Sequence, residues 1–272
     1  KHIKIIAVDL DDTLLTEDLS ISDYTVEVLR KAAQAGIYIV IASGRTDNAI
    51  LPYVRRLELA GTQQGRYIIS QNGAVIVDLH ARLPIYERFV DSSVLVYANT
   101  EAKKIGLFPE VYNESTIFVE QMNKWTELDV KLSGLNVQIT PAFEQYLQKG
   151  HPKMIIPGDP EIVSALKEKL QSVIGKSCVM FTSKPYFLEI MPLASGKGEA
   201  LEHLCSVLSI PREQTMAFGD SWNDESMMRY ANHSVCMSNG LEGIKQIARH
   251  VTKFSHNEDG LARFIEEHVL DR

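Results

Sequence analysis

Short apolar runs alternate with amphipathic stretches over the first 82 residues of the chain. Continuous apolar runs are typical of buried strands in a parallel sheet, and the pattern predicts three of them, at 5–8, 37–42 and 67–70. Between the first two runs, Ser22 precedes apolar residues at helical spacing, which predicts a capped helix that ends near Gly36. Strands that alternate with helices in this way predict parallel pairing with right-handed crossovers.

Two local signals refine this first region. Pro52 lies inside the next helical pattern and predicts that the helix is interrupted or restarted there. Asn72-Gly73 is a strong turn signal after the third strand, so residues 74–77 are expected to return as the second strand of a hairpin.

The pattern changes near residue 83 and stays different up to residue 188. Pairs of short strands are interleaved with helices here, which is typical of an α+β layer with one face of its sheet covered by helices. The expected strands are 109–112, 116–120, 136–140, 153–156, 178–182 and 186–191, and the expected helices are 91–105, 124–134, 142–149 and one that ends near 173. Residues 83–188 are therefore expected to form a separate domain inserted into the chain.

After residue 188 the first pattern resumes. An amphipathic helix at 195–208 is followed by strands at 215–218, 234–237 and 250–252, with helices at 223–230, from Leu241 and from about Glu258. The outer segments, 1–82 and 189–272, are expected to fold together. The predicted fold class is α/β: a Rossmann-like, doubly wound parallel-sheet core with an inserted α+β domain.

Composition narrows the functional classes. The 272 residues carry a formal net charge of −7, which argues against a nucleic-acid surface and gives no reason to expect an anionic membrane as partner. No apolar run of about 18 residues is present, so no transmembrane helix is predicted. Three scattered cysteines are expected to be buried free thiols, and without a signal-peptide pattern the predicted location is the cytoplasm. Since the sequence starts at Lys1 rather than at methionine, its native start stays open.

Polar residues follow four of the predicted strands, and they are the candidates for chemistry. They are Asp9 and Asp11, Ser43, Asn72, and Asp220 with Asp224. In an open parallel sheet, ligands bind outside the carboxyl ends of the strands at a switch in strand order, which would gather these residues into one crevice. Lys197, at the start of its predicted helix, can reach the same rim.

This set of residues suits phosphoryl transfer from a monoester. Asp9 can act as a nucleophile and form an aspartyl-phosphate, and Asp11 can serve as general acid and then general base. Mg²⁺ prefers oxygen ligands, which Asp9, Asp220 and a backbone carbonyl at Asp11 would supply. Ser43 offers a hydroxyl and neighbouring backbone N–H groups to a phosphate oxygen, and Lys197 offers a positive charge.

Each motif alone also has an ordinary explanation. Asp-Asp-Thr after a strand often caps a helix or forms a turn, and Ser43-Gly44-Arg45 reads as the start of a capped helix. A single lysine is usually a solvated surface residue. What favours function is the combination, in which each group lies at the end of a strand or the start of a helix.

In combination, the motifs resemble the haloacid dehalogenase (HAD) superfamily of phosphohydrolases, in its Cof-type branch of sugar-phosphate phosphatases. Asp9-Leu10-Asp11-Asp12-Thr13 is similar to the first family motif, and Gly219-Asp220 with Asn223-Asp224 is similar to the fourth. Ser43 and Lys197 stand where the second and third motifs are expected, and the segment 255–260 resembles the usual ending of the branch.

The resemblance implies roles for these residues. Asp9 would be nucleophile and metal ligand, Asp11 the acid and base, and Asp220 the second carboxylate ligand of Mg²⁺. Asp224 would lie on the metal side or orient Lys197, with Asn223 in the same loop. The inserted domain would be a cap that closes over the crevice and chooses the substrate.

Four further residues are candidate contacts of phosphate or substrate: Thr13, Gly44, Arg45 and Asn72. Arg45 would either pair with phosphate or stabilise a helix surface, and Asn72 would either touch substrate or serve its turn.

The predicted function is therefore Mg²⁺-dependent hydrolysis of small phosphate monoesters, such as sugar phosphates, through an aspartyl-phosphate. A small phosphorylated metabolite is the expected partner, with no nucleic acid, membrane or obligate protein partner. Two alternatives use related chemistry: a sugar-phosphate phosphotransferase or mutase, and a phospho-accepting switch that does not hydrolyse. A binding protein that has lost catalysis is a third, and the intact acids argue against it.

Overall fold

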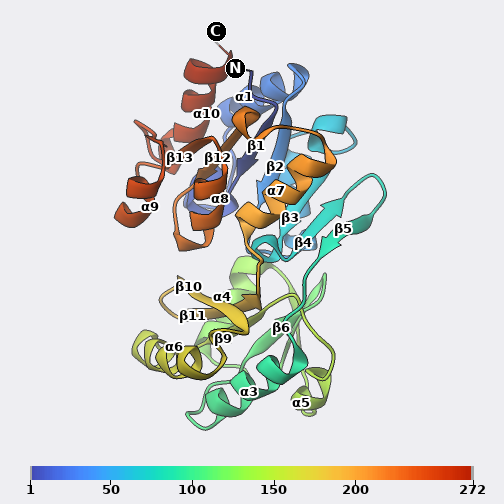
Figure 1. Ribbon diagram of the computed structural model, residues 1–272, viewed down its shortest axis with the longest axis vertical. Helices are drawn as coiled ribbons and strands as arrows, with labels where there is room; N and C mark the ends of the chain where they lie inside the picture. The colour runs from blue at the N-terminus through green and yellow to red at the C-terminus, as the bar shows by residue number, and fades with distance from the viewer. Residues whose placement is uncertain (1, 271–272) are drawn as a thin grey trace. The chain divides into compact units, whose positions relative to one another are not determined.

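The structure, a computed structural model, describes residues 2–270, and the chain separates into two compact units (Figure 1). The split unit consists of Lys1–Tyr86 and Gly196–Arg272, and the inserted unit is Glu87–Ser195. These boundaries lie four and seven residues beyond the expected ones, at 82 and 188. The boundaries shift because of strand pairing. Strand β5 (Leu83–Glu87) belongs to the sheet of the split unit, and β11 (Phe187–Pro192) belongs to the sheet of the inserted unit.

The split unit is built on an eight-stranded sheet in the order β14-β13-β12-β1-β2-β3-β4-β5. The strands besides β5 are β1 (Ile5–Val8), β2 (Tyr38–Ala42), β3 (Tyr67–Ser70), β4 (Val75–Asp78), β12 (Thr215–Gly219), β13 (His233–Cys236) and β14 (His250–Val251). Strand β1 pairs in parallel with both β2 and β12. The chain thus builds outward from β1 in two directions, which makes the carboxyl ends of β1 and β12 the switch point where a ligand is expected.

The helices of the split unit are α1 (Asp23–Gln34), α2 (Asp47–Arg56), α7 (Lys197–Val207), α8 (Glu225–Tyr230), α9 (Glu242–Ile247) and α10 (Gly260–Ile265). The predicted cap of α1 is confirmed, since the Ser22 side chain accepts a hydrogen bond from the Thr25 N–H. Apolar side chains of β1, β2 and β12 are fully buried and pack with those of α7 and α8 in one core. That packing explains why these strands read as continuous apolar runs.

Two expectations for helices need correction. The predicted break at Pro52 is wrong, because α2 continues through Pro52 and only the one backbone donor that proline lacks is lost. The predicted final helix is divided into a 3-10 turn at His256–Glu258, helix α10 and a π-helical turn at Glu266–Leu270.

The inserted unit contains a six-stranded sheet in the order β10-β11-β9-β6-β7-β8. Its further strands are β6 (Glu110–Tyr112), β7 (Thr116–Val119), β8 (Asn136–Ile139), β9 (Met154–Pro157) and β10 (Cys178–Lys184). Its helices are α3 (Ser92–Lys103), α4 (Lys124–Ser133), α5 (Phe143–Tyr146) and α6 (Pro160–Ile174). Helix α5 is shorter than the expected 142–149.

Helices of the inserted unit contact both faces of its sheet, whereas the pattern predicted helices on one. Val111 of β6 packs in a core with residues of α3 and α6. Neighbouring Tyr112 points to the opposite face, as alternate residues of a strand do, and its hydroxyl reaches Asp129 of α4. A polar cluster therefore lies under α4.

Among the residues that the structure describes, no helix combines the length and the apolar character needed to cross a membrane.

Candidate active site

Asp9 is the first residue after β1, and the chain turns immediately beyond it. The Asp9 N–H donates to the Phe218 carbonyl at 3.0 Å, which ties the end of β1 to β12. Asp11 has an extended backbone (φ −73°, ψ 131°), and Asp12 has a left-handed one (φ 59°). The following residues close wide turns, in which Leu14 N–H donates to the Asp9 carbonyl and Leu15 N–H to the Leu10 carbonyl. Wide turns of this π type are frequently found at functional sites.

Lys197 enters the same place from the start of α7. Its side chain is fully buried, and its Nζ lies 2.5 Å from Asp9 Oδ1 and 2.7 Å from Asp224 Oδ1. Gly73 makes this approach possible, because a Cβ at its position would meet the Gly196 carbonyl oxygen at 2.0 Å. The turn predicted at Asn72-Gly73 therefore also serves to seat the first turn of α7.

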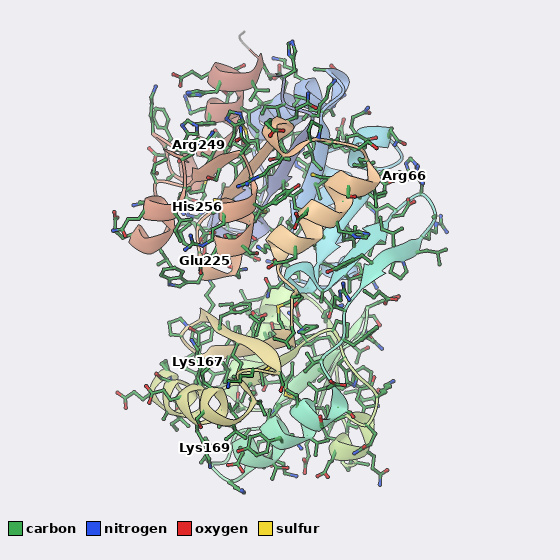
Figure 2. All side chains as sticks on the ribbon, in the orientation of Figure 1. Arg66, Lys167, Lys169, Glu225, Arg249 and His256 are labelled. Atoms are coloured by element: carbon green, nitrogen blue, oxygen red, sulfur yellow. The ribbon has the colours of Figure 1, made fainter. Side chains whose placement is uncertain are left out.

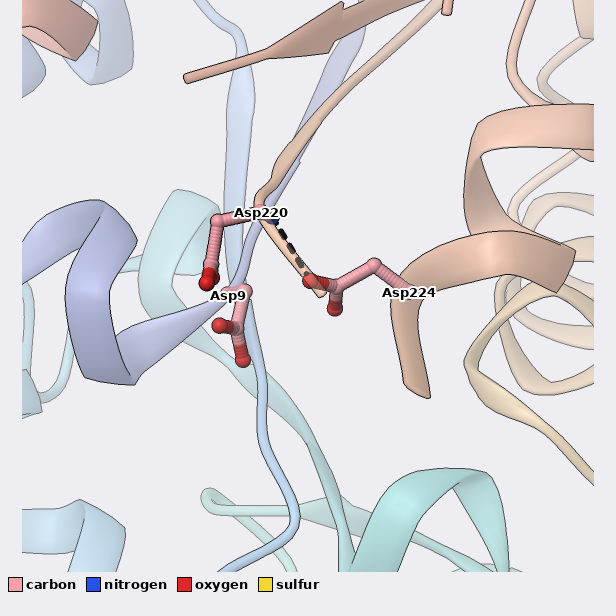
Figure 3. Close-up of side chains that lie close together, drawn as sticks. All are labelled: Asp9, Asp220 and Asp224. Carbon is pink, nitrogen blue, oxygen red and sulfur yellow. Dashed lines mark hydrogen bonds between the residues drawn. The ribbon is translucent and has the colours of Figure 1, made fainter. Parts of the chain in front are cut away.

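Asp220 and Asp224 come from the loop after β12. The Asp224 carboxylate accepts from the backbone N–H groups of Asp220 and Ser221 at 2.9 and 3.1 Å. Thr13 Oγ1 donates to Asp220 Oδ1 at 2.9 Å, so the turn after β1 and this loop are bonded directly. Figure 3 shows the three carboxylates of Asp9, Asp220 and Asp224 turned toward one another.

The electrostatics of this group explain why it needs positive charge. Burial, together with the charge of Asp224, raises the pKa of Asp9, and Lys197 opposes that rise without cancelling it. Burial and the charge of Asp9 raise the pKa of Asp220 in the same way. Burial alone would lower the pKa of Lys197, but the charges of Asp224 and Asp9 outweigh it and raise that pKa, so the ammonium stays charged.

The donor set fits a hard divalent cation. Asp9, Asp220 and Asp224 offer carboxylate oxygens that lie within 4.8 Å of one another. Oxygen ligands at this spacing are what Mg²⁺ prefers. When all three carboxylates are ionised, they and the single ammonium of Lys197 leave two negative charges, which a divalent cation would balance.

Asp11 and Arg45 form a pair that the sequence did not predict. Arg45 Nε and Nη2 donate to the two carboxylate oxygens of Asp11 at 3.0 and 2.6 Å. The Arg45 guanidinium lies over the Tyr53 ring, 5.5 Å from its centroid, and is largely buried. Arg45 was expected either to pair with phosphate or to stabilise a helix surface. In the structure it instead orients the Asp11 side chain.

The remaining predicted residues form a second small group. Asn223 Nδ2 donates to Asn72 Oδ1 at 3.0 Å, which joins the β3–β4 turn to the loop after β12. A Cβ on Gly44 would meet the Asn72 side chain at 3.0 Å, so glycine keeps that position open. Ser43 is buried at the end of β2, and its Oγ accepts from the Arg45 N–H at 3.1 Å.

Asn239 and His256 also contact the turn after β1, and sequence reasoning did not single them out. Asn239 Nδ2 donates to the Asp12 carbonyl at 2.9 Å, and His256 Nδ1 lies 2.8 Å from the Leu15 carbonyl. A signal for the first was present, because Asn239-Gly240 follows the predicted strand 234–237 as the other candidate residues follow theirs.

At the carboxyl ends of the parallel strands, three carboxylates gather around a buried lysine, which is the arrangement of an active site in an α/β enzyme. The family model for haloacid dehalogenase-like hydrolases matches residues 6–265, and the chain belongs to that family, as its motifs predicted.

Relatives support this assignment along the whole chain. A putative phosphatase of Streptococcus pyogenes is 30% identical over 272 residues, which cover 99% of both chains. A haloacid dehalogenase-like hydrolase from Bacteroides thetaiotaomicron has a similar structure, with a TM-score of 0.88 and 29% identity over 97% of this chain and 99% of that one. A solved structure described as a HAD subclass IIB sugar phosphatase gives a TM-score of 0.86 and 26% identity, covering 97% and 98%.

Proposed function

We propose that this protein is a Mg²⁺-dependent phosphatase that hydrolyses small phosphate monoesters, of the sugar-phosphate kind, through an aspartyl-phosphate on Asp9. One observation carries the proposal: a fully buried Lys197 bridges Asp9 and Asp224, beside Asp220, at the switch point of the sheet. The names of the relatives, a putative phosphatase and a sugar phosphatase, are consistent with this substrate class.

The first step transfers the phosphoryl group to the enzyme. A carboxylate oxygen of Asp9 attacks phosphorus, the bond to the ester oxygen breaks, and Asp11 donates its proton to the departing oxygen, which leaves as an alcohol. Lys197 holds the Asp9 carboxylate in place and offers positive charge to the oxygens of the transferring group.

The second step restores the enzyme. Asp11 takes a proton from water, the water oxygen attacks phosphorus, and the bond from phosphorus to the Asp9 oxygen breaks. Inorganic phosphate leaves, and both aspartates return to their initial states. Arg45 donates to both oxygens of the Asp11 carboxylate, so it orients this group in the ionised form that acts as the base of this step.

Mg²⁺ would be held by Asp9 and Asp220, with Asp224 on the same side and the Asp11 carbonyl as a further oxygen. When bound, it supplies charge that stabilises the phosphate oxygens in the transition state. Asp224 also keeps the loop of Asp220 in shape through its two backbone hydrogen bonds.

The test is turnover of an aryl phosphate with Mg²⁺ by wild type, Asp9→Asn and the matched control Asp12→Asn. Loss of the nucleophile should lower kcat by about 10³-fold or more. Asp12 has a left-handed backbone that asparagine also tolerates, so the control should stay near wild type. Strong activity in Asp9→Asn would contradict the mechanism, and a shortfall of inorganic phosphate against alcohol released would indicate transfer to another acceptor.

A further inference from the structure

The turn after β13, residues 237–241, is bonded to both loops that carry the candidate carboxylates. Leu241 N–H donates to the Asp220 carbonyl at 2.8 Å. Asn239 Nδ2 donates to the Asp12 carbonyl at 2.9 Å, in the loop that carries Asp9. One short turn therefore contacts the Asp9 side and the Asp220 side of the site together.

The C-terminal segment 255–260 extends this contact. His256 N–H donates to Asn239 Oδ1 at 3.0 Å, and His256 Nδ1 lies 2.8 Å from the Leu15 carbonyl. A carbonyl oxygen only accepts, so the Nδ1 atom must carry the proton in this bond. Asn239 and His256 are thus one linked pair that donates to the carbonyls of Asp12 and Leu15. Figure 2 labels His256 in the C-terminal part of the split unit.

These two carbonyls belong to the segment whose shape decides where Asp9 and Asp11 point. Just before the first of these carbonyls the backbone passes from the extended form at Asp11 to the left-handed form at Asp12, and the wide turn then closes at Leu15. A left-handed aspartate is less favourable than a right-handed one, so a hydrogen bond from outside the turn adds to the bonds that already close it. The hydrogen bond from Asn239 reaches the carbonyl of that same residue.

We propose that Asn239 and His256 are positioning residues, which hold the turn after β1 so that Asp9 and Asp11 keep their places relative to Asp220. This inference rests on the proposed phosphatase function for its kinetic consequence. It also gives a role to the segment 255–260, which the catalytic groups leave unexplained.

The expected size of the effect separates positioning from simple stabilisation. Asn239 is exposed and His256 is half-buried, so each hydrogen bond should contribute only about 0.5–1.5 kcal/mol to the free energy of unfolding. A displacement of about 1 Å of a catalytic group can lower the rate by about 10²-fold. A positioning role therefore predicts a loss of kcat out of proportion to the loss of stability.

Asn257 provides a matched control on the same segment. It is also an exposed asparagine, and its Oδ1 accepts from the Glu17 N–H at 2.8 Å, two residues beyond Leu15. Its bond ties the same chain to the same C-terminal segment, but outside the turn that carries Asp9 and Asp11.

The experiment compares Asn239→Ala, His256→Ala, His256→Asn and Asn257→Ala in the full chain. The measurements are the melting temperature, kcat and KM with an aryl phosphate, and Mg²⁺ affinity by calorimetry without substrate. We expect Asn239→Ala and His256→Ala to lower kcat about 10-fold or more, with KM within about twofold, and to weaken Mg²⁺ binding. His256→Asn should recover most of both, because its side-chain amide donates from near the Nδ1 position. Asn257→Ala should match wild type in kcat and Mg²⁺ affinity.

The inference is overturned if Asn239→Ala and His256→Ala behave like Asn257→Ala in kcat and Mg²⁺ affinity, or if only KM rises. Failure of the phosphatase proposal would give a different result, because wild type itself would turn over no ester. The Mg²⁺ affinities of the variants would then still show whether Asn239 and His256 hold the turn after β1 in place. If wild type turns over ester, a set of variants with unchanged kcat and Mg²⁺ affinity counts against the positioning role alone.

Discussion

Each unit of the molecule buries a group of acids, and the two groups balance their charge by different means. In the split unit, Asp9 and Asp224 share the ammonium of Lys197, with Asp220 beside them. In the inserted unit, Glu110 of β6 and Asp129 of α4 face each other across the Tyr112 hydroxyl, at 2.9 and 2.6 Å. Burying a charge is costly unless it is paired, so both groups require an explanation.

Counting protons distinguishes the second group. A phenol has one proton and donates one hydrogen bond, so only one of its two close carboxyl contacts can accept from it. At the other contact, a carboxylic acid that keeps its proton can donate to the phenol oxygen. Burial and the charge of Asp129 raise the pKa of Glu110 well above its usual value, which identifies Glu110 as the acid that keeps a proton.

The comparison teaches how a buried acid cluster can be read. Where one acid keeps its proton, as at Glu110, the buried cluster carries less charge and can have a purely structural role. Around Lys197, burial raises the pKa of Asp9 and of Asp220 as well, but here an ammonium is present and a bound metal ion would keep the three carboxylates ionised. Position agrees with this division, since of these two clusters only the one around Lys197 lies at the switch point of a parallel sheet.

The largest expected effect follows from removing the ammonium. Lys197→Met keeps the length of the side chain but leaves Asp9, Asp220 and Asp224 without their buried cation. We expect loss of about 3–5 kcal/mol in the free energy of unfolding without metal, together with loss of turnover. Mg²⁺ should stabilise the variant more than wild type, since it supplies part of the missing charge. Urea unfolding in the presence of a chelator measures this loss. If the variant and wild type were equally stable, the three acids around Lys197 would also hold protons, and the contrast with Glu110 would be wrong.

A smaller effect is expected from the bridge in the inserted unit. Tyr112→Phe removes the hydroxyl between Glu110 and Asp129 and leaves two buried carboxyl groups with unmade hydrogen bonds. The inserted unit should lose about 1–3 kcal/mol, while kcat for an aryl phosphate should change little. Trp125 of α4 can report on this unit in a Trp222→Phe background, because the chain has only two tryptophans. A change of less than about 0.5 kcal/mol would show that the bridge does not hold the cluster together.

The most gradual effect is a dependence on pH. Glu110 has a raised pKa in the folded state, so it binds its proton more tightly when folded than when unfolded. Its contribution to stability is complete below the ordinary glutamate pKa of about 4.3 and is lost as pH rises through the folded pKa, by at most about 1.4 kcal/mol per pH unit.

Glu110→Gln, the neutral counterpart of the protonated acid, should remove this slope. Urea unfolding followed by Trp125 fluorescence at pH 5, 7 and 9 would measure it. Identical slopes in wild type and variant would contradict the assignment of the proton to Glu110. Lys153 has to be considered in the same experiment, since its ammonium lies 4.7 Å from the centre of the Tyr112 ring.

Most of the fold could be predicted from the sequence because its signals are local. The apolar runs, the Ser22 cap and the Asn72-Gly73 turn each depend on residues within a few positions of one another, and each was confirmed. Strand β5 was not predicted; it contains Pro84, which is tolerated because β5 lies at the edge of the sheet. The break predicted at Pro52 was wrong because a proline costs a helix only part of its stability, and the other residues of α2 keep the helix continuous.

The candidate site shows the same division. The sequence by itself determined which residues follow the strands, and the rule for parallel sheets was enough to gather Asp9, Lys197 and Asp220 at one place. Only the tertiary structure decided which side chains touch: Arg45 with Asp11, Asn239 with Asp12, and Tyr112 with its two acids. These contacts join segments whose alignment depends on packing of whole elements, and a shift of one residue in a strand or one turn in a helix would break them. Local pattern sets where a polar group stands along the chain, and packing sets its partner.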